Sequence, residues 1–111
     1  MGKVATLDEV RDFLKRFKQT ASEPGKWILA NRTKNLSGIT TLGIAVADVK
    51  PTVLALTEAE YKSGPEADRD GSSGEIWTFE VDYLGRTVYI KLKLDQKRAK
   101  CLSFHPSGWH L

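Results

Sequence analysis

The most regular hydrophobic pattern in the chain is the strict alternation of residues 87–94 (TVYIKLKL). Alternation with a period of two is typical of a β-strand, because successive side chains point to opposite faces of the sheet. One face of this strand would be wholly apolar and is formed by Val88, Ile90, Leu92 and Leu94. The other face would carry Thr87, Tyr89, Lys91 and Lys93. The pattern therefore predicts a strand with one face in the core and one open face.

A similar alternation in the flanking segments predicts a three-stranded antiparallel meander. In residues 75–83 one face consists of Trp77, Phe79, Val81 and Tyr83. Residues 99–105 form the last strand, and its natural core side chains are Leu102 and Phe104. The opposite face of that strand then carries Cys101, Ser103 and His105. Short turns at residues 84–86 (LGR) and 95–97 (DQK) connect the three strands.

The first part of the chain has the spacing of an amphipathic helix. Thr6 and Glu9 are placed as a capping box, in which each side chain bonds the backbone N–H of the other residue. Apolar residues then recur at positions i, i+3, i+4 and i+7, and these are Val10, Phe13, Leu14 and Phe17. After a turn at residues 22–25, residues 27–30 (WILA) predict a short strand.

Weaker patterns predict two further helices. Over residues 34–42 the apolar positions fall on one face, which is formed by Leu36, Ile39 and Leu42. Gly43 provides a C-terminal stop for this helix. We expect Asp48 to cap the next helix, because Pro51 is tolerated within a first turn. The buried side of that helix would be formed by Val49, Val53, Leu54 and Leu56.

One more helical turn and a loop lead into the meander. Residues 57–60 (TEAE) repeat the capping-box spacing and predict a brief turn that ends near residues 61–62. Residues 64–74 (GPEADRDGSSG) are rich in Gly, Ser and charge, and therefore predict a loop. Helices first and strands after them indicate a single α+β domain over residues 1–111, with an antiparallel sheet and helices packed on one of its faces.

Composition and charge narrow the class of protein without defining its function. The 111 residues are 41% hydrophobic and 28% charged, which is ordinary for one globular domain. Neither an apolar signal segment nor an apolar run of the roughly 18 residues that span a bilayer occurs, so we expect a cytoplasmic protein without a membrane partner. The one cysteine excludes an internal disulfide, and the net charge of +3 permits an anionic partner such as nucleic acid.

The open face of the predicted meander collects residues that could carry chemistry. Tyr89, Lys91 and His105 share this face, and Lys62 lies close enough in the chain to reach its rim. Lysine ammonium groups can hold a phosphate and stabilise charge that develops on its oxygens. Histidine can move a proton near neutral pH. These residues therefore form a candidate phosphodiester site, whereas for each residue alone a solvated surface or cross-strand packing is the alternative.

Other chemistries lack the residues that they need. Cys101 has no second cysteine at a metal-binding spacing, and His105 and His110 do not form a ligand set. The carboxylates of the 64–74 loop do not have the spacing of a cation-binding loop. The chain contains neither a GxxxxGK[ST] phosphate loop nor a GxGxxG motif. The sequence therefore predicts no metal and no cofactor.

Several segments between residues 54 and 105 resemble, in the same order, the MqsR family of bacterial type II toxins. The matching segments are LT…EYKSG, EIWTF, GRTVYIKL and CLSFH. The ordered set carries the resemblance, while the N-terminal helix and the first strand agree in pattern only. The resemblance implies a RelE-like toxin fold, cleavage of mRNA without a metal ion, and a cognate antitoxin as a partner.

By position, the resemblance points to Lys62, Tyr89 and His105 as catalytic residues, and we add Lys91 from the same open face. It implies that a ribose 2′-hydroxyl attacks the adjacent phosphate while side chains supply a base, an acid and positive charge. Tyr89 and His105 would be the base and the acid, in an order that the sequence leaves open. In the best-known member of the family a lysine occupies the position of His105, and a glutamine that of Thr78.

Two other readings compete with a ribonuclease toxin. The first is a non-catalytic RNA-binding module, in which the tyrosine and lysines of the open face stack bases and contact phosphates. The second is a relative that shares the fold without the activity. The resemblance also leaves open whether cleavage requires the ribosome, which would then be a partner in addition to mRNA and the antitoxin.

Overall fold

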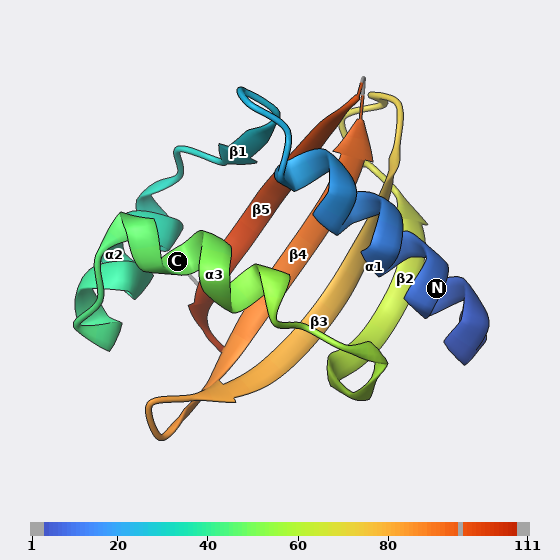
Figure 1. Ribbon diagram of the computed structural model, residues 1–111. Coiled ribbons are helices and arrows are strands. Elements are labelled where there is room, and N and C mark those ends of the chain that lie inside the picture. Colours follow the sequence, from blue (N-terminus) through green and yellow to red (C-terminus); the bar gives the residue numbers. More distant parts are fainter. Residues whose placement is uncertain (1–3, 96, 109–111) are drawn as a thin grey trace.

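The computed structural model describes residues 4–95 and 97–108, and these are organised around one five-stranded sheet (Figure 1). In chain order the elements are α1 (Leu7–Ala21), β1 (Trp27–Leu29), α2 (Thr33–Leu42), the 3₁₀ turn η1 (Val46–Asp48), α3 (Val49–Leu54), the 3₁₀ turn η2 (Glu58–Glu60), β2 (Tyr61–Ala67), β3 (Glu75–Tyr83), β4 (Arg86–Asp95) and β5 (Arg98–Pro106). Gln96 of the last predicted turn and His110 lie outside the described residues.

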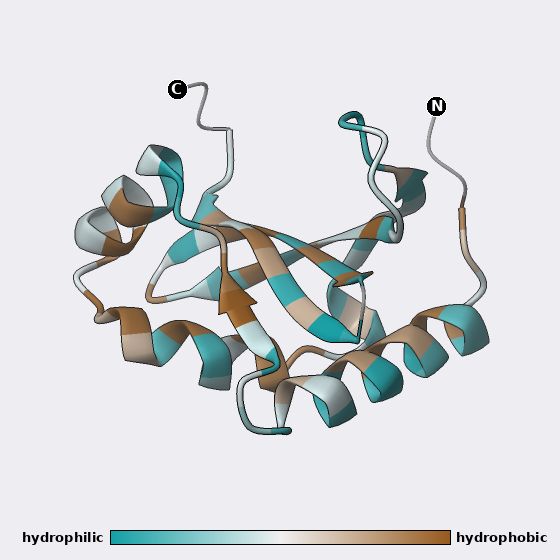
Figure 2. Ribbon diagram, turned by 90° about the horizontal axis from the view of Figure 1, so that it is seen from above, coloured by the Kyte–Doolittle hydropathy of each residue, from teal (hydrophilic) through white to brown (hydrophobic). Residues whose placement is uncertain are grey.

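The strand order in the sheet is β1-β5-β4-β3-β2, so the strand with the strictest alternation is the central one. Strands β2 to β5 pair antiparallel, and β1 pairs in parallel with β5. Helices α1 and α3 cover one face of the sheet (Figure 1). Seen from above, α2 lies beside the sheet, along the edge of β5, and the loop after β2 rises on the side away from α1 and α3 (Figure 2). The predicted α+β class and the antiparallel meander are therefore confirmed.

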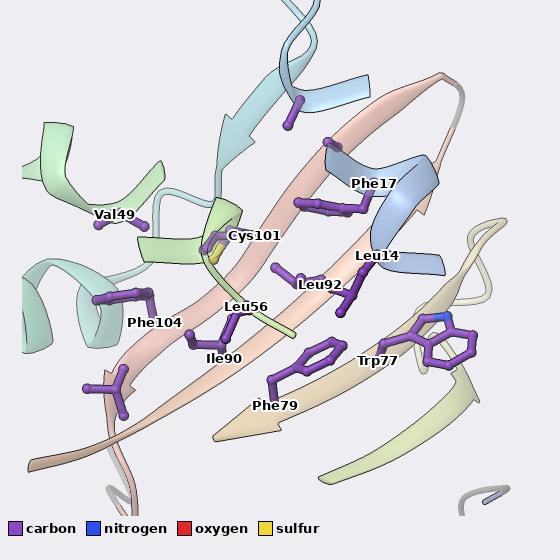
Figure 3. Packing of buried hydrophobic residues seen from close by; sticks show 14 of the residues in the cluster. Leu14, Phe17, Val49, Leu56, Trp77, Phe79, Ile90, Leu92, Cys101 and Phe104 are labelled. Carbon is purple, nitrogen blue, oxygen red and sulfur yellow. The ribbon is translucent and has the colours of Figure 1, made fainter. Parts of the chain in front are cut away.

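The hydrophobic core lies between the sheet and the two helices that cover it (Figure 3). Most of the side chains that the alternation and the helical stripe predicted for the core are buried, and these are Val10, Phe13, Leu14, Phe17, Trp77, Phe79, Val88, Ile90 and Leu92. The predicted core residues Val81, Tyr83 and Leu94 are only partly buried. The rings of Phe13 and Trp77 stack with centroids 4.5 Å apart. Burial of these side chains, at about 25 cal/mol per Å² of apolar surface, is the main source of stability.

The helix ends follow the predicted caps in two cases and depart from them in one. The backbone N–H of Glu9 donates to Thr6 Oγ1 at 3.2 Å, and the Thr6 N–H donates to Glu9 Oε1 at 3.0 Å, which completes the capping box of α1. The same arrangement occurs at Thr57 in front of η2. The prediction that Asp48 caps α3 is wrong, because its carboxylate accepts instead from the N–H of Ala45 at 2.8 Å and closes η1.

Helix α2 buries two of the three apolar residues predicted for its inner face, Ile39 and Leu42, and the third, Leu36, lies outside. Leu36 is 48% exposed, whereas Asn35 and Gly38 are buried against β5. The side chain of Asn35 donates to the carbonyls of Ala30 and Leu102 and accepts from the N–H of Phe104, at 3.0–3.1 Å. These three bonds hold α2 on the last strand, so a polar residue and a glycine share its contact surface with Ile39 and Leu42. Gly43 ends the helix in the left-handed conformation (φ 72°), as predicted.

The predicted loop over residues 64–74 is wrong for residues 64–67, which belong to β2. Glycine and proline suggested a break, but β2 is the edge strand of the sheet, where a missing N–H is tolerated. The pairing with β3 shifts register on both sides of Ser63, which accommodates these residues. Gly64 has φ 109°, and a Cβ there would lie 2.6 Å from the carbonyl oxygen of Ile76, so glycine is required at this point.

A β-bulge in β5 overturns part of the predicted alternation in the last strand. Lys91 pairs with Ser103 and Leu92 with Cys101, so the extra residue on β5 is Leu102. Cys101 is therefore fully buried in the core, although the strict alternation placed it on the open face (Figure 3). Leu102, predicted in the core, lines a hollow on the open face instead.

Candidate active site

The face of the sheet opposite α1 and α3 carries a hollow of about 480 Å³, lined by all four residues that the sequence singled out. Tyr89 on β4 lies directly opposite His105 on β5 and Glu80 on β3. Lys62, at the start of β2, forms an ion pair with Glu80. Together with Lys91 on β4, these side chains come from four adjacent strands. The structure thus brings the four candidates together, while their catalytic roles stay predictions.

The rings of Tyr89 and His105 are close neighbours in the hollow. Their centroids are 5.5 Å apart, with 33° between the ring planes. Lys91, two residues further along β4, places its Nζ 5.6 Å from the centroid of the Tyr89 ring. A phenol, an imidazole and an ammonium group are therefore close enough to contact one phosphodiester group from different sides.

The surroundings of His105 disfavour its protonated form. His105 is only 4% exposed, because Gly38 of α2 packs directly on its backbone and Cβ. Its Nδ1 lies 2.9 Å from the carbonyl oxygen of Pro106. Since a carbonyl only accepts, Nδ1 carries the hydrogen in this bond and Nε2 is the acceptor nitrogen of the neutral ring. Burial lowers the pKa of His105 below its ordinary value of 6.5, and the positive charges of Lys34 and Lys91 lower it further.

The ion pair between Lys62 and Glu80 forms one wall of the site. The hydrogen bond and the charge of Glu80 raise the pKa of Lys62, and the bond from Lys62 is the main reason why the pKa of Glu80 is lowered. Ser107, beyond the end of β5, donates from Oγ to the second carboxylate oxygen of Glu80 at 3.0 Å. Both groups are therefore charged at neutral pH, and the ion pair ties the edge strand to the segment after β5.

The hollow is also lined by two cationic side chains that the sequence did not point to. Arg32 and Lys34 reach it from the start of α2. Within residues 4–95 and 97–108, neither of them nor Lys91 forms an ion pair. These residues follow β1, the short strand that the sequence predicted, and β1 pairs with β5, the strand that carries His105. The pairing of β1 with β5 is therefore the feature from which their position could have been inferred.

A second hollow of about 270 Å³ adjoins the first, and Arg32 and Lys91 line both. Its other lining residues come from β2 and the loop after it, from β3 and from the bulge in β5, and they are Glu66, Ala67, Asp68, Arg69, Ile76 and Leu102. Arg32 and Lys91 therefore stand between two neighbouring hollows on the open face.

A buried ion pair fixes the loop beside the second hollow. Lys93 was predicted on the open face, and it points that way, but its side chain is only 3% exposed. Its Nζ lies 2.7 Å from Asp68 and donates to Ser72 at 2.6 Å, and it is 3.8 Å from Asp95. Bonds from Lys93 and from the backbone of Asp70 lower the pKa of Asp68 to about 2. The loop is thus tied to β4 by an ion pair whose carboxylate, Asp68, stays ionised across the physiological pH range.

The structure can also be examined for metal sites and for membrane-spanning helices. No three His, Cys, Asp or Glu side chains among the described residues come together in an arrangement that could hold a metal ion. In the same part of the chain, every helix is too short or too polar to cross a bilayer.

The fold and the hollow together define a class of protein. A mostly antiparallel five-stranded sheet with helices packed on it, and a cation-lined face that carries tyrosine and histidine, is consistent with the RelE-like toxins. The chain belongs to the MqsR toxin family, because the family model described as "Motility quorum-sensing regulator, toxin of MqsA" matches residues 7–106. Toxins of this family are mRNA interferases. A comparison with curated proteins finds no match.

Proposed function

We propose that this chain is an endoribonuclease that cleaves mRNA without a metal ion, through attack of a ribose 2′-hydroxyl on the adjacent phosphate. The observation that supports this most is the buried His105, whose pKa is lowered, beside Tyr89 and Lys91 in one cation-lined hollow. Membership of a family of mRNA interferases supports the substrate class.

In this proposal His105 acts as the general base. The bond from Nδ1 to Pro106 orients the ring, and Nε2 takes the proton from the 2′-hydroxyl. The 2′-oxygen forms a bond to phosphorus, and the bond from phosphorus to the 5′-oxygen of the next nucleotide breaks. The products are a 2′,3′-cyclic phosphate and a 5′-hydroxyl end. The lowered pKa of His105 favours this assignment over a role as the acid, because it disfavours the protonated ring that a general acid needs.

Tyr89 acts as the general acid and Lys91 as the main contact to the phosphate. The phenol donates its proton to the departing 5′-oxygen, and the proton held by His105 returns to the phenolate through solvent once the products leave. The ammonium group of Lys91 stabilises the charge that builds on the non-bridging oxygens. Lys62 contacts the same phosphate from its ion pair with Glu80. Removal of a general acid or base typically costs about 10²–10⁴-fold in rate.

The test is cleavage of a defined RNA by purified protein in the presence of EDTA. We expect the wild type to produce fragments that end in 2′,3′-cyclic phosphate, and Tyr89→Phe and His105→Asn to be slower by about 10²-fold or more. Asn at position 105 retains a side-chain N–H for the Pro106 carbonyl but lacks Nε2. Tyr83→Phe is the matched control, because Tyr83 packs against the core on the other face.

Full activity in both site variants would refute the assignment, and loss of wild-type cleavage in EDTA would refute the metal-independent mechanism. RNA that binds the wild type but is not cleaved, alone or with ribosomes added, would favour the non-catalytic RNA-binding module. Cleavage only with ribosomes would make the ribosome a partner besides mRNA. We also propose that an antitoxin of the MqsA kind binds and silences the protein in the cytoplasm, since the family description pairs the toxin with MqsA.

A further inference from the structure

We propose that the second hollow is a nucleobase subsite, which holds the base of a nucleotide next to the cleaved phosphodiester and favours bases with an exocyclic amino group. The position of the cleaved bond rests on the function proposed above. The binding of the base does not, because it depends only on the residues that line the second hollow.

The two hollows are joined in a way that suits one continuous strand of RNA. Lys91 and Arg32 line both of them, and Arg69 adds a third cation to the second. Within the described part of the chain none of these three cations forms an ion pair with a carboxylate. Cations spaced along a groove are the arrangement that follows a phosphate backbone. When a phosphate lies at Lys91, the neighbouring nucleotide reaches the second hollow.

The lining of the second hollow offers an apolar surface for the face of a base. The bulge in β5 turns Leu102 onto the open side of the sheet, and Ile76 of β3 lines the same hollow. Both side chains are half-buried. Bulges occur often beside active sites, where they redirect a side chain. The flat face of a nucleobase is a suitable partner for two half-buried aliphatic groups in an otherwise charged surface.

Glu66 supplies the means of reading the edge of the base. Its carboxylate lines the second hollow, is exposed, and has no ion-pair or hydrogen-bond partner among the described residues. A free carboxylate repels phosphate, so it weakens RNA binding unless it accepts hydrogen bonds from the ligand. Adenine, cytosine and guanine present an exocyclic amino group that can donate to a carboxylate, and uracil does not.

The subsite is preformed, because the buried Lys93 holds Asp68 at 2.7 Å and so fixes the loop that carries Arg69. In contrast to Glu66, the carboxylate of Asp68 is already engaged by this ion pair. We therefore assign the reading of the base edge to Glu66 alone.

The experiment measures binding of fluorescent 2′-O-methyl hexamers of adenosine, cytidine and uridine, which lack the attacking hydroxyl and so are not cleaved. We expect the wild type to bind the adenosine and cytidine oligomers about fivefold more tightly than the uridine oligomer, which is the value of one hydrogen bond at about 1 kcal/mol. Glu66→Ala should remove this preference. Glu75→Ala is the matched control, because Glu75 is also exposed and pairs with the same end of β2, but lines a depression on the α1 side. Both substitutions remove one negative charge, so only a change in preference distinguishes them.

A second variant tests the apolar surface. Leu102→Ala should weaken the binding of all three oligomers by about fivefold and leave the preference intact, since it removes contact with the face of the base rather than with its edge. Equal affinities for the three oligomers in the wild type, an unchanged preference in Glu66→Ala, or no binding of any oligomer would overturn the subsite. Binding with the expected preference, combined with the failure of RNA cleavage described above, would retain the subsite and refute the nuclease.

Discussion

The contact between α2 and His105 can be tested by adding one methyl group at Gly38. A Cβ there would lie 2.7 Å from the Cβ and 2.9 Å from the Cα of His105, and 3.1 Å from the carbonyl oxygen of Phe104. These neighbours are backbone atoms and a Cβ, so a change of rotamer cannot relieve the overlap. In Gly38→Ala, either α2 must move off β5 or the strand must move with its histidine.

Two opposing contributions determine the size of the effect of Gly38→Ala. Replacing a glycine by alanine within a helix gains about 1 kcal/mol of helix propensity. Overpacking in a close contact costs about 1–3 kcal/mol, and two distances below 3.0 Å to rigid atoms place this site at the upper end. We therefore expect a net loss of about 2 kcal/mol, which lowers Tm by roughly 8 °C in a domain of this size. A displacement of His105 should also slow RNA cleavage by on the order of 10–100-fold under conditions where the variant is folded.

Urea and thermal unfolding measure the first effect, and the cleavage assay with EDTA measures the second. Thr41→Ala is the control, because Thr41 is exposed on the same helix and the substitution gains helix propensity without a new contact. We expect this control to be at least as stable as the wild type and fully active. If Gly38→Ala matched the control in both assays, α2 would not pack on His105 as described, and the explanation for the burial of that histidine would fail.

Three further predictions follow from charges on the open side of the sheet. Lys93→Met leaves Asp68 without its buried cation and should lower the free energy of unfolding in urea by about 3 kcal/mol. As a control, Lys15→Met on the exposed side of α1 should change this free energy by less than about 0.5 kcal/mol. Equal values for the two variants would show that the ion pair is not buried. The pKa of Asp68 is about 2 in the folded protein against an ordinary 3.8, so its ion pair stabilises the fold above pH 3.8 and is lost as the pH falls toward 2. Between these pH values the free energy of unfolding of Asp68→Asn should therefore depend less on pH than that of the wild type. Because the pKa of His105 is lowered, the acidic limb of the pH profile of kcat/KM should lie below pH 6.5. Lys34→Met removes a nearby positive charge and should move this limb to higher pH. A limb at the same pH in Lys34→Met and the wild type would contradict His105 as the base.

The strands and the long helix could be predicted from the sequence because local patterns determine them. The alternation in residues 87–94 and the stripe that starts at Val10 each repeat one physical period over several residues. The position of Tyr89 and His105 in the hollow could be predicted from the same alternation. Once Tyr89 and His105 were assigned to one face of adjacent strands, the antiparallel register placed them opposite each other.

The errors arose where tertiary contacts override local patterns. The bulge at Leu102 adds one residue to β5 and reverses the faces on its N-terminal side, and no residue type in that segment signals it. In α2 the apolar spacing correctly predicted the burial of Ile39 and Leu42, but not that of Asn35, which depends on partners in other elements. Arg32 and Lys34 join the site only because a three-residue strand pairs with β5, so their role depends on topology rather than on a motif.

The burial of Cys101 has a practical consequence for experiments in solution. It is the one cysteine in the chain, it is fully buried in the core, and burial raises its thiol pKa to about 12. A thiol reagent therefore finds no reactive group on the folded protein, and modification of Cys101 reports unfolding of the whole molecule. A new cysteine on the surface, such as Ser107→Cys at the rim of the first hollow, would then be the one labelling site, and a single fluorophore there could follow the arrival of RNA in real time without removal of the native thiol.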